Sequence, residues 1–148
     1  MSFKRILCAV DFSPRSNQAF DEAVQLAQAN KAKLFILHAI EVQPLASGWF
    51  EPDGLSDLTL QVEEKAKQSL EALQNSVADQ LAKLSVHSEI TSGRAFTEIL
   101  ENARVWDADL IVMGGTGFGA LEDLPLGSTV NRVLNEADCS VLVVKNGG

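Results

Sequence analysis

Two stretches of the sequence hold residue types that can bind an anion. One is the glycine-rich run Gly114-Gly115-Thr116-Gly117-Phe118-Gly119, which leads on to Gly127-Ser128-Thr129. Four glycines within six residues cost backbone entropy, and they suit a chain that turns sharply to bring its N–H groups against an anion. We expect Ser128 and Thr129 to open a helix, whose free N–H groups and dipole favour phosphate. The other stretch is Asp11-Phe12-Ser13-Pro14, directly after an apolar run.

The glycine run differs from the two common nucleotide-binding patterns. Gly115, Gly117 and Ala120 loosely imitate a dinucleotide fingerprint, but they follow a late strand instead of opening the chain. No Gly-Lys-Ser/Thr follows, so the run is not a P-loop. The residues alone leave an alternative open, in which the run is a flexible connector and Ser128 an ordinary N-cap.

The elements that must position these residues alternate between strand and helix. Apolar runs and alternating patterns predict strands over residues 6–10, 34–40, 86–91, 110–113 and 140–145. Helical spacing follows the Ser13-Pro14 start signal, and it recurs from Val62 to Leu84, from Phe96 to Ala103, and from Val130 on. This order predicts an α/β fold with a parallel sheet, helices on both faces, and residues 86–91 at an edge.

A long loop is predicted over residues 41–56, which hold Pro44, Gly48, Pro52 and Gly54. Loops of this length are usually functional. Its aromatic pair, Trp49 and Phe50, suggests a cap over a ligand or a contact surface, with packing onto the domain as the alternative.

Length, composition and charge narrow the class of protein. A chain of 148 residues fits one domain over 1–148. Its net charge of −8, without a Lys/Arg run, argues against nucleic-acid and anionic-membrane partners. The apolar run Ile6–Val10 is too short for a signal peptide, and no run approaches the roughly 18 residues of a membrane span. We therefore expect a cytoplasmic protein.

Neither cysteine nor histidine spacing indicates a metal site or a catalytic triad. Cys8 and Cys139 are expected to be free thiols, because neither CxxC nor His-rich spacing accompanies them. His38 is expected to be a satisfied core or crevice histidine, His87 to lie on the surface, and Trp106 to pack in the core.

Several of these features together resemble the universal stress protein family. Gly114-x-x-Gly117, then nine residues, then Gly127-Ser128 is similar to the G-x2-G-x9-G-[ST] signature of its ATP-binding members. The opening residues 6–13 and the closing residues 139–144 resemble the family's first and last strands. The resemblance covers nearly the whole chain.

This resemblance implies a doubly wound, Rossmann-like sheet of the adenine nucleotide alpha hydrolase type, with five parallel strands in the order 3-2-1-4-5. The crevice at its switch point would take an adenine nucleotide. Asp11 would face the ribose or adenine, Ala9 would line the base pocket, and the backbone of Ala39 would contact adenine. The residues implied around the ribose and phosphates are Met113, Gly114, Gly117, Gly127, Ser128 and Thr129.

Two departures from the family pattern bear on the choice of nucleotide. Phe118 stands where many relatives carry Arg, and Glu122 and Asp123 lie in a segment without Lys or Arg. Each carboxylate disfavours a nearby triphosphate by about 1 kcal/mol if partly screened. AMP, ADP or cyclic AMP would suffer less repulsion than ATP, unless Mg²⁺ or Mn²⁺ bridges the charges.

Three functions follow from these residues. The first is a nucleotide-binding regulatory protein of the stress response with little or no turnover, because no catalytic base is identified. The second is a slow ATPase or phosphotransferase, in which Asp11 or Glu122 places a metal and water. The third is an interaction module with a vestigial pocket and an unknown protein partner.

The last predicted strand also bears on assembly. Residues 140–145 are apolar and β-branched, and the family order places them at the sheet edge, where an uncovered strand risks aggregation. The same strand of a second copy would cover it, as in relatives. We therefore expect a homodimer through residues 140–145.

Overall fold

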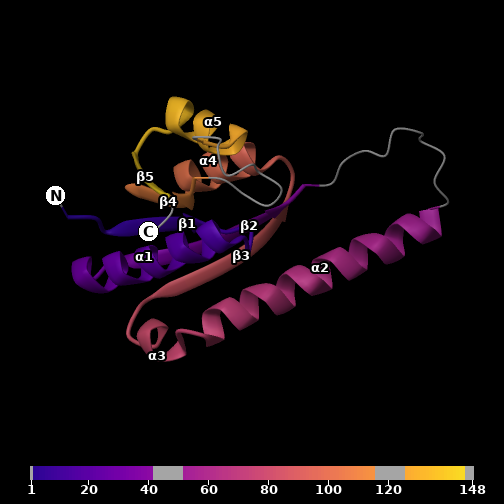
Figure 1. The fold of residues 1–148 in the computed structure, drawn as a ribbon, viewed down its shortest axis with the longest axis horizontal. Helices are drawn as coiled ribbons and strands as arrows, with labels where there is room; N and C mark the ends of the chain where they lie inside the picture. The colour runs from indigo at the N-terminus through magenta and orange to yellow at the C-terminus, as the bar shows by residue number, and fades with distance from the viewer. Residues whose placement is uncertain (1, 42–51, 116–125, 146–148) are drawn as a thin grey trace.

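The computed structural model describes residues 2–41, 52–115 and 126–145. Strands and helices alternate along the chain as the sequence predicts (Figure 1). The strands are β1 (Arg5–Ala9), β2 (Lys33–Ile40), β3 (Val86–Ser92), β4 (Leu110–Gly114) and β5 (Ser140–Val144). The helices are α1 (Pro14–Asn30), α2 (Pro52–Asn75), α3 (Ala78–Leu81), α4 (Ala95–Val105) and α5 (Ser128–Glu136).

The five strands form one parallel sheet in the order β3-β2-β1-β4-β5, which confirms the predicted doubly wound topology. β1 lies in the centre and pairs with β2 and β4, with Cys8 opposite Ile36 on one side and Val112 on the other. β3 and β5 lie at the two edges. The strand order reverses between β1 and β4, so the switch point lies at their carboxyl ends.

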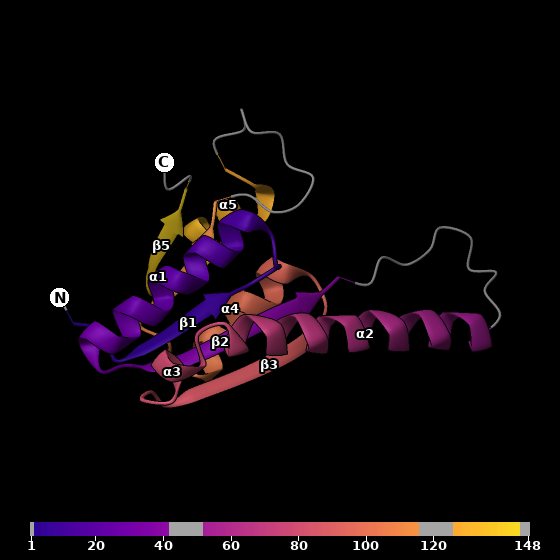
Figure 2. The same ribbon diagram turned by 60° about the horizontal axis from the view of Figure 1, so that its bottom comes forward.

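Two layers of helices cover the sheet, as Figures 1 and 2 show. Alternate strand residues face opposite layers, because side chains in a strand point alternately to its two faces. Ile6, Cys8 and Val10 pack with α1, α2 and α3, whereas Leu7 packs with α4 and α5. Central strands buried on both faces explain the continuous apolar runs in the sequence.

The start of α1 follows the predicted signal. Ser13 is the N-cap, and its hydroxyl oxygen accepts a hydrogen bond from the Ser16 N–H at 3.3 Å. Pro14 occupies the first turn, where its missing N–H costs nothing. These residues place the first turn of α1 beside the carboxyl end of β1.

The region from 41 to 84 corrects two predictions. The loop predicted over residues 41–56 is wrong in its last part, since α2 begins at Pro52; residues 42–51, with Trp49 and Phe50, lie outside the described chain. Proline is tolerated in a first helical turn, so Pro52 marks a helix start and not a loop. The single helix expected up to Leu84 is also divided, because α2 ends at Asn75 and α3 is a separate short helix.

No helix in the described ranges is long and apolar enough to cross a membrane. The cytoplasmic location and the single domain over 1–148 stay predictions.

Candidate functional site

Asp11 holds the turn between β1 and α1 with one of its carboxylate oxygens. Its Oδ1 accepts from the Ser13 N–H at 2.9 Å, and its own N–H donates to the Ser16 hydroxyl at 2.9 Å. Phe12 between them has the left-handed φ of 66°, which is uncommon for a bulky residue. No described residue bonds Oδ2 of this exposed side chain.

Gly114 ends β4 where α1 comes closest to the sheet. A Cβ on Gly114 would lie 2.9 Å from the Arg15 carbonyl carbon and 2.9 Å from the Ser16 nitrogen. Real Cβ atoms do not approach backbone so closely, so the packing of α1 already requires glycine here. The sequence predicts a different reason for this glycine, namely its place beside the ribose and phosphates of a nucleotide.

The start of α5 is tied to the end of β4. The Gly127 N–H donates to the Gly115 carbonyl at 2.8 Å, and the Gly115 N–H donates to Val144 at 2.9 Å. Gly127 is the N-cap of α5, so Ser128 and Thr129 are its first two helical residues and Ser128 is not an N-cap. The N–H groups of a first helical turn have no partner within the helix, and they favour an anion.

Ala39 lies where β2 outruns β1. The pairs between β1 and β2 end at Ala9 and Leu37, while β2 continues to Ile40. The last bond of this ladder runs from the Val10 N–H to the Leu37 carbonyl at 2.9 Å. The backbone N–H and C=O of Ala39 face the same side as those of Leu37, because alternate residues of a strand face the same neighbour. Past Val10, no described residue pairs with the N–H or C=O of Ala39 on the side of β2 that faces β1.

The remaining predicted site residues divide between the crevice and the core. Ala9 is half-buried at the end of β1. The Met113 side chain is 5% exposed and packs in the core beneath α4 and α5, so its backbone is the part nearest the switch point. Gly117, Phe118, Glu122 and Asp123 lie outside the described residues.

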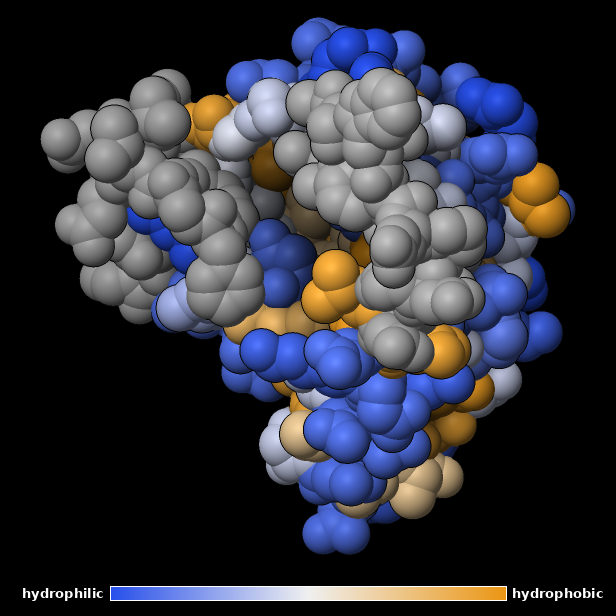
Figure 3. Space-filling model, turned by 90° about the vertical axis from the view of Figure 1, so that its right-hand side faces the viewer, coloured by the Kyte–Doolittle hydropathy of each residue, from blue (hydrophilic) through white to orange (hydrophobic). Residues whose placement is uncertain are grey.

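The fold therefore brings Ala39, Asp11 and the start of α5 to the carboxyl ends of three adjacent strands, β2, β1 and β4. Figure 3 faces this end of the sheet, whose visible surface is partly apolar and partly polar. The N-termini of α1 and α5 also lie here and contribute positive potential. In the described ranges, no group of three or more His, Cys, Asp or Glu side chains is placed to hold a metal ion.

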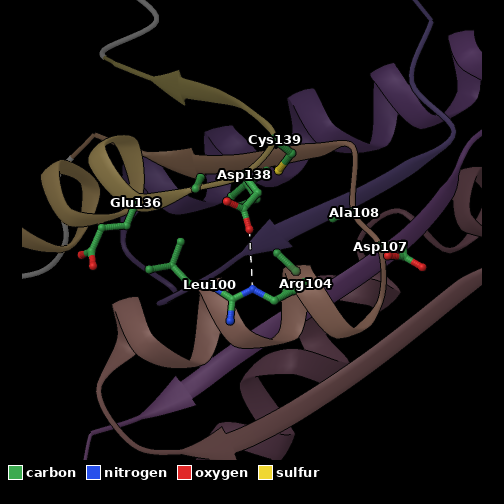
Figure 4. A pocket seen from close by; sticks show the side chains of 10 residues that line it. Leu100, Arg104, Asp107, Ala108, Glu136, Asp138 and Cys139 are labelled. Carbon is green, nitrogen blue, oxygen red and sulfur yellow. Dashed lines mark ion pairs between the residues drawn. The ribbon is translucent and has the colours of Figure 1, made fainter.

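A cavity of about 210 Å³ lies at the opposite end of the sheet (Figure 4). It is lined by Leu100, Ala103 and Ile111, and Arg104 of α4 pairs with Asp138 at 3.5 Å across it. Both charged side chains are mostly exposed, so this ion pair is weak. Its place at the amino end of β5 separates this cavity from the switch point.

Both cysteines are free thiols in the structure, as predicted. Burial raises the pKa of the Cys8 thiol far above its usual range, with a further contribution from Asp21. Burial, Asp109 and Asp138 raise the pKa of Cys139. Cys8 and Cys139 face opposite layers of the sheet, so they cannot pair.

The other ring side chains follow their expected placements. His87 is exposed and lies 3.5 Å from Glu89. Trp106 packs edge-on against Phe35, with 5.3 Å between ring centroids. His38 is half-buried, and its Nδ1 lies 2.7 Å from the Val10 carbonyl oxygen.

Sequence reasoning missed Ser16 as a site residue. Its side chain is 3% exposed, and it fixes the Asp11 backbone from inside the turn. The signal was present in the spacing of Ser13 and Ser16, which matches the N-cap and third residue of a helix.

Comparison with known proteins agrees with this architecture. A doubly wound parallel sheet with its switch point between two central strands defines the class of Rossmann-like α/β proteins. The family model described as "Universal stress protein family" matches residues 2–145, and the chain belongs to that family.

Relatives align along nearly their whole length. The chain is 36% identical to universal stress protein A homolog 1 of Coxiella burnetii, with 97% of each chain covered. Among solved structures, universal stress protein UspA from Lactobacillus plantarum superposes with a TM-score of 0.81 at 28% identity, covering 97% of this chain and 99% of that one.

Two structures with the same fold contain an adenine nucleotide. A universal stress protein in complex with cAMP has a TM-score of 0.66 at 24% identity, with 97% and 98% of the chains covered. A universal stress protein family protein from Arabidopsis thaliana with AMP bound has a TM-score of 0.67 at 16% identity, with 98% and 93% covered.

Proposed function

We propose that this protein binds an adenine nucleotide at the carboxyl ends of β2, β1 and β4, as a regulatory protein of the universal stress response with little or no turnover. The observation that carries the proposal is the gathering, at three adjacent strand ends, of hydrogen-bonding groups that no described residue pairs. These groups are the Ala39 backbone, Oδ2 of the Asp11 carboxylate and the first N–H groups of α5.

Each group suits a different part of a nucleotide. The N–H and C=O of Ala39 match the donor and acceptor edge of a base, with Ala9 beside them. Oδ2 of Asp11 accepts from a ribose hydroxyl in a charge-assisted hydrogen bond. The start of α5, from Gly127 to Thr129, together with Gly114 and Gly117, receives phosphate.

The charge of the chain favours a nucleotide with few phosphates. With a net charge of −8, and with Glu122 and Asp123 shortly after the glycine-rich run, AMP or cyclic AMP meets less repulsion than ATP. Two neighbours in fold hold these two ligands. Mg²⁺ or Mn²⁺ would reduce the difference by binding the phosphates of ATP.

Titration calorimetry with ATP, ADP, AMP and cyclic AMP, with and without Mg²⁺, tests the proposal. We expect saturable binding with one site per chain, and no release of phosphate from ATP above the background rate. Asp138→Ala is the control, because this exposed residue lies at the opposite end of the sheet. Absence of binding of all four nucleotides would refute the proposal.

We also propose that two copies pair through β5. β5 is an edge strand, as the family order implied, and Leu142 on it is 37% exposed. An apolar edge strand that meets its own copy across a two-fold axis leaves no open edge.

A further inference from the structure

His38 replaces a backbone bond at the end of the β1–β2 ladder. After the Val10 N–H has donated to Leu37, the next bond of a parallel ladder would run from the Ala39 N–H to the Val10 carbonyl. Instead, Nδ1 of His38 lies 2.7 Å from that carbonyl oxygen. The last paired residues of the two strands are Ala9 and Leu37. A carbonyl oxygen only accepts, so Nδ1 carries the hydrogen and donates it.

The same ring supports the turn that carries Asp11. The ring centroids of His38 and Phe12 are 4.6 Å apart, at an interplanar angle of 44°. Phe12 has the left-handed φ of 66°, a conformation that persists only where the surroundings hold it. His38 therefore touches the turn that carries Asp11, through Val10 and Phe12. It is also the chain neighbour of Ala39, which we propose binds the base.

We propose that His38 is a positioning residue that makes the protein selective for adenine. Its ring bonds the Val10 carbonyl and so leaves the N–H of Ala39 to a base, beside the Ala39 C=O, which lies past the last pair of β1 and β2. This inference rests on the proposed nucleotide site.

The polarity of these two groups fits adenine and opposes guanine. Adenine offers an acceptor at N1 and a donor at N6, which match a backbone N–H and C=O. Guanine offers a donor at N1 and an acceptor at O6, so each of its groups would meet a like group. A site that leaves buried polar groups mismatched rejects the wrong ligand strongly.

Titration calorimetry with ATP and GTP on wild type, His38→Phe and His38→Asn tests this role. Phenylalanine keeps a ring against Phe12 but has no donor, so the Val10 carbonyl would turn to Ala39. We expect ATP to bind His38→Phe about tenfold more weakly, the order of one hydrogen bond, with little change for GTP. Asparagine places an amide donor close to the position of Nδ1 and should restore most of the preference for ATP.

The ratio of the two affinities separates positioning from a general structural effect. An equal loss for ATP and GTP in His38→Phe, or unchanged ATP binding, overturns the inference and leaves the proposed function in place. A wild type that binds both nucleotides equally also overturns it. A wild type that binds neither ATP nor GTP overturns the inference as well, and the proposed function is removed only if ADP, AMP and cyclic AMP also fail to bind. His87→Phe, on the exposed face of β3, is the matched control and should bind as wild type does.

Nitrogen NMR of the imidazoles tests the geometry without any ligand and with His38 unchanged. The chain has two histidines, so the His87→Phe variant assigns both signals. We expect Nδ1 of His38 to be protonated at neutral pH, whether the ring is neutral or charged, because both forms can donate from Nδ1. An unprotonated Nδ1 on His38 would contradict the hydrogen bond to Val10 and overturn the inference.

Discussion

A Cβ on Gly114 would lie 2.9 Å from the carbonyl carbon of Arg15. The last residue of β4 and the first turn of α1 therefore lie too close together for a side chain to fit between them. The neighbouring glycine differs, since a Cβ on Gly115 would be 3.5 Å from its nearest neighbour, a methyl group of Val143. The packing of the described residues therefore requires glycine at position 114 but not at position 115.

Gly114→Ala should destabilise the protein by about 1–3 kcal/mol, because backbone must shift to admit the methyl group. Gly115→Ala is the matched control and should cost less, since its contacts are of ordinary van der Waals length. Urea denaturation of the two variants measures the difference. Equal stability of the two variants would contradict the close approach of α1.

Asp11→Ala should weaken AMP binding by about one to two orders of magnitude, through the loss of a charge-assisted hydrogen bond. Asp11→Asn keeps Oδ1 as an acceptor for the Ser13 N–H, so it should preserve the turn while removing the charge. Calorimetry with both variants separates the charge from the turn. Unchanged affinity in a folded Asp11→Ala would place the nucleotide elsewhere.

Val143→Pro should convert a dimer into a monomer or make it precipitate. The Val144 carbonyl accepts from Gly115, the residue after β4, so alternate residues put the Val143 N–H on the open side of β5. Light scattering at micromolar concentration should give about 32 kDa for wild type, twice the 16.0 kDa chain.

Leu142→Pro is the contrasting variant for that experiment. Its N–H faces β4 by the same alternation, so proline there should destabilise the sheet itself. A monomeric wild type across the same concentrations would refute the pairing of β5.

Thr91→Val should leave stability unchanged or raise it by up to about 1–2 kcal/mol. The Thr91 hydroxyl is buried without a hydrogen-bond partner in the described chain, and valine has nearly the same shape. Thermal denaturation checks this, with Thr91→Ser as the variant that keeps the hydroxyl and loses the methyl group. A clear loss of stability in Thr91→Val would mean that the hydroxyl has a partner in solution.

The raised thiol pKa values predict a loss of stability at alkaline pH. Folding keeps Cys8 and Cys139 protonated to a higher pH than in the unfolded chain. The unfolded chain thus loses these protons first as the pH rises above about 8.5, and the contribution to stability present below that pH is lost. Urea denaturation at about pH 8 and 10 should show a smaller loss in the Cys8→Ala/Cys139→Ala variant than in wild type. An identical loss would exclude the thiols as its source.

Local sequence patterns predicted the elements wherever a single segment decides its own structure. The Ser13-Pro14 start and the strand at residues 110–113 depend on capping and on apolar runs, and both are confirmed. The strand order came from the resemblance to a family, because periodicity alone does not order strands within a sheet. The start of α2 was missed because Pro52 and Gly54 also suit a loop.

The site was predictable in its residues but not in its contacts. Asp11 and Ser128 follow from motif and position, and the fold brings both to the switch point. The bond from His38 to Val10 joins different strands, so no local pattern signals it. The need for glycine at position 114 likewise depends on how α1 packs against β4. The sequence pattern instead explains this glycine by contact with a phosphate.

β1 has five residues and β2 has eight, so the sheet has a step beside its central strand. A step of this kind leaves backbone N–H and C=O groups of the longer strand unpaired by the shorter one. These groups can bind a ligand, and they are the same whatever side chain stands at that position. Substitutions at Ala39 that keep the strand would therefore leave the hydrogen-bonding chemistry of the step unchanged. Selectivity for a base can in this way persist when the residue at position 39 is substituted, provided that β1 stays shorter than β2.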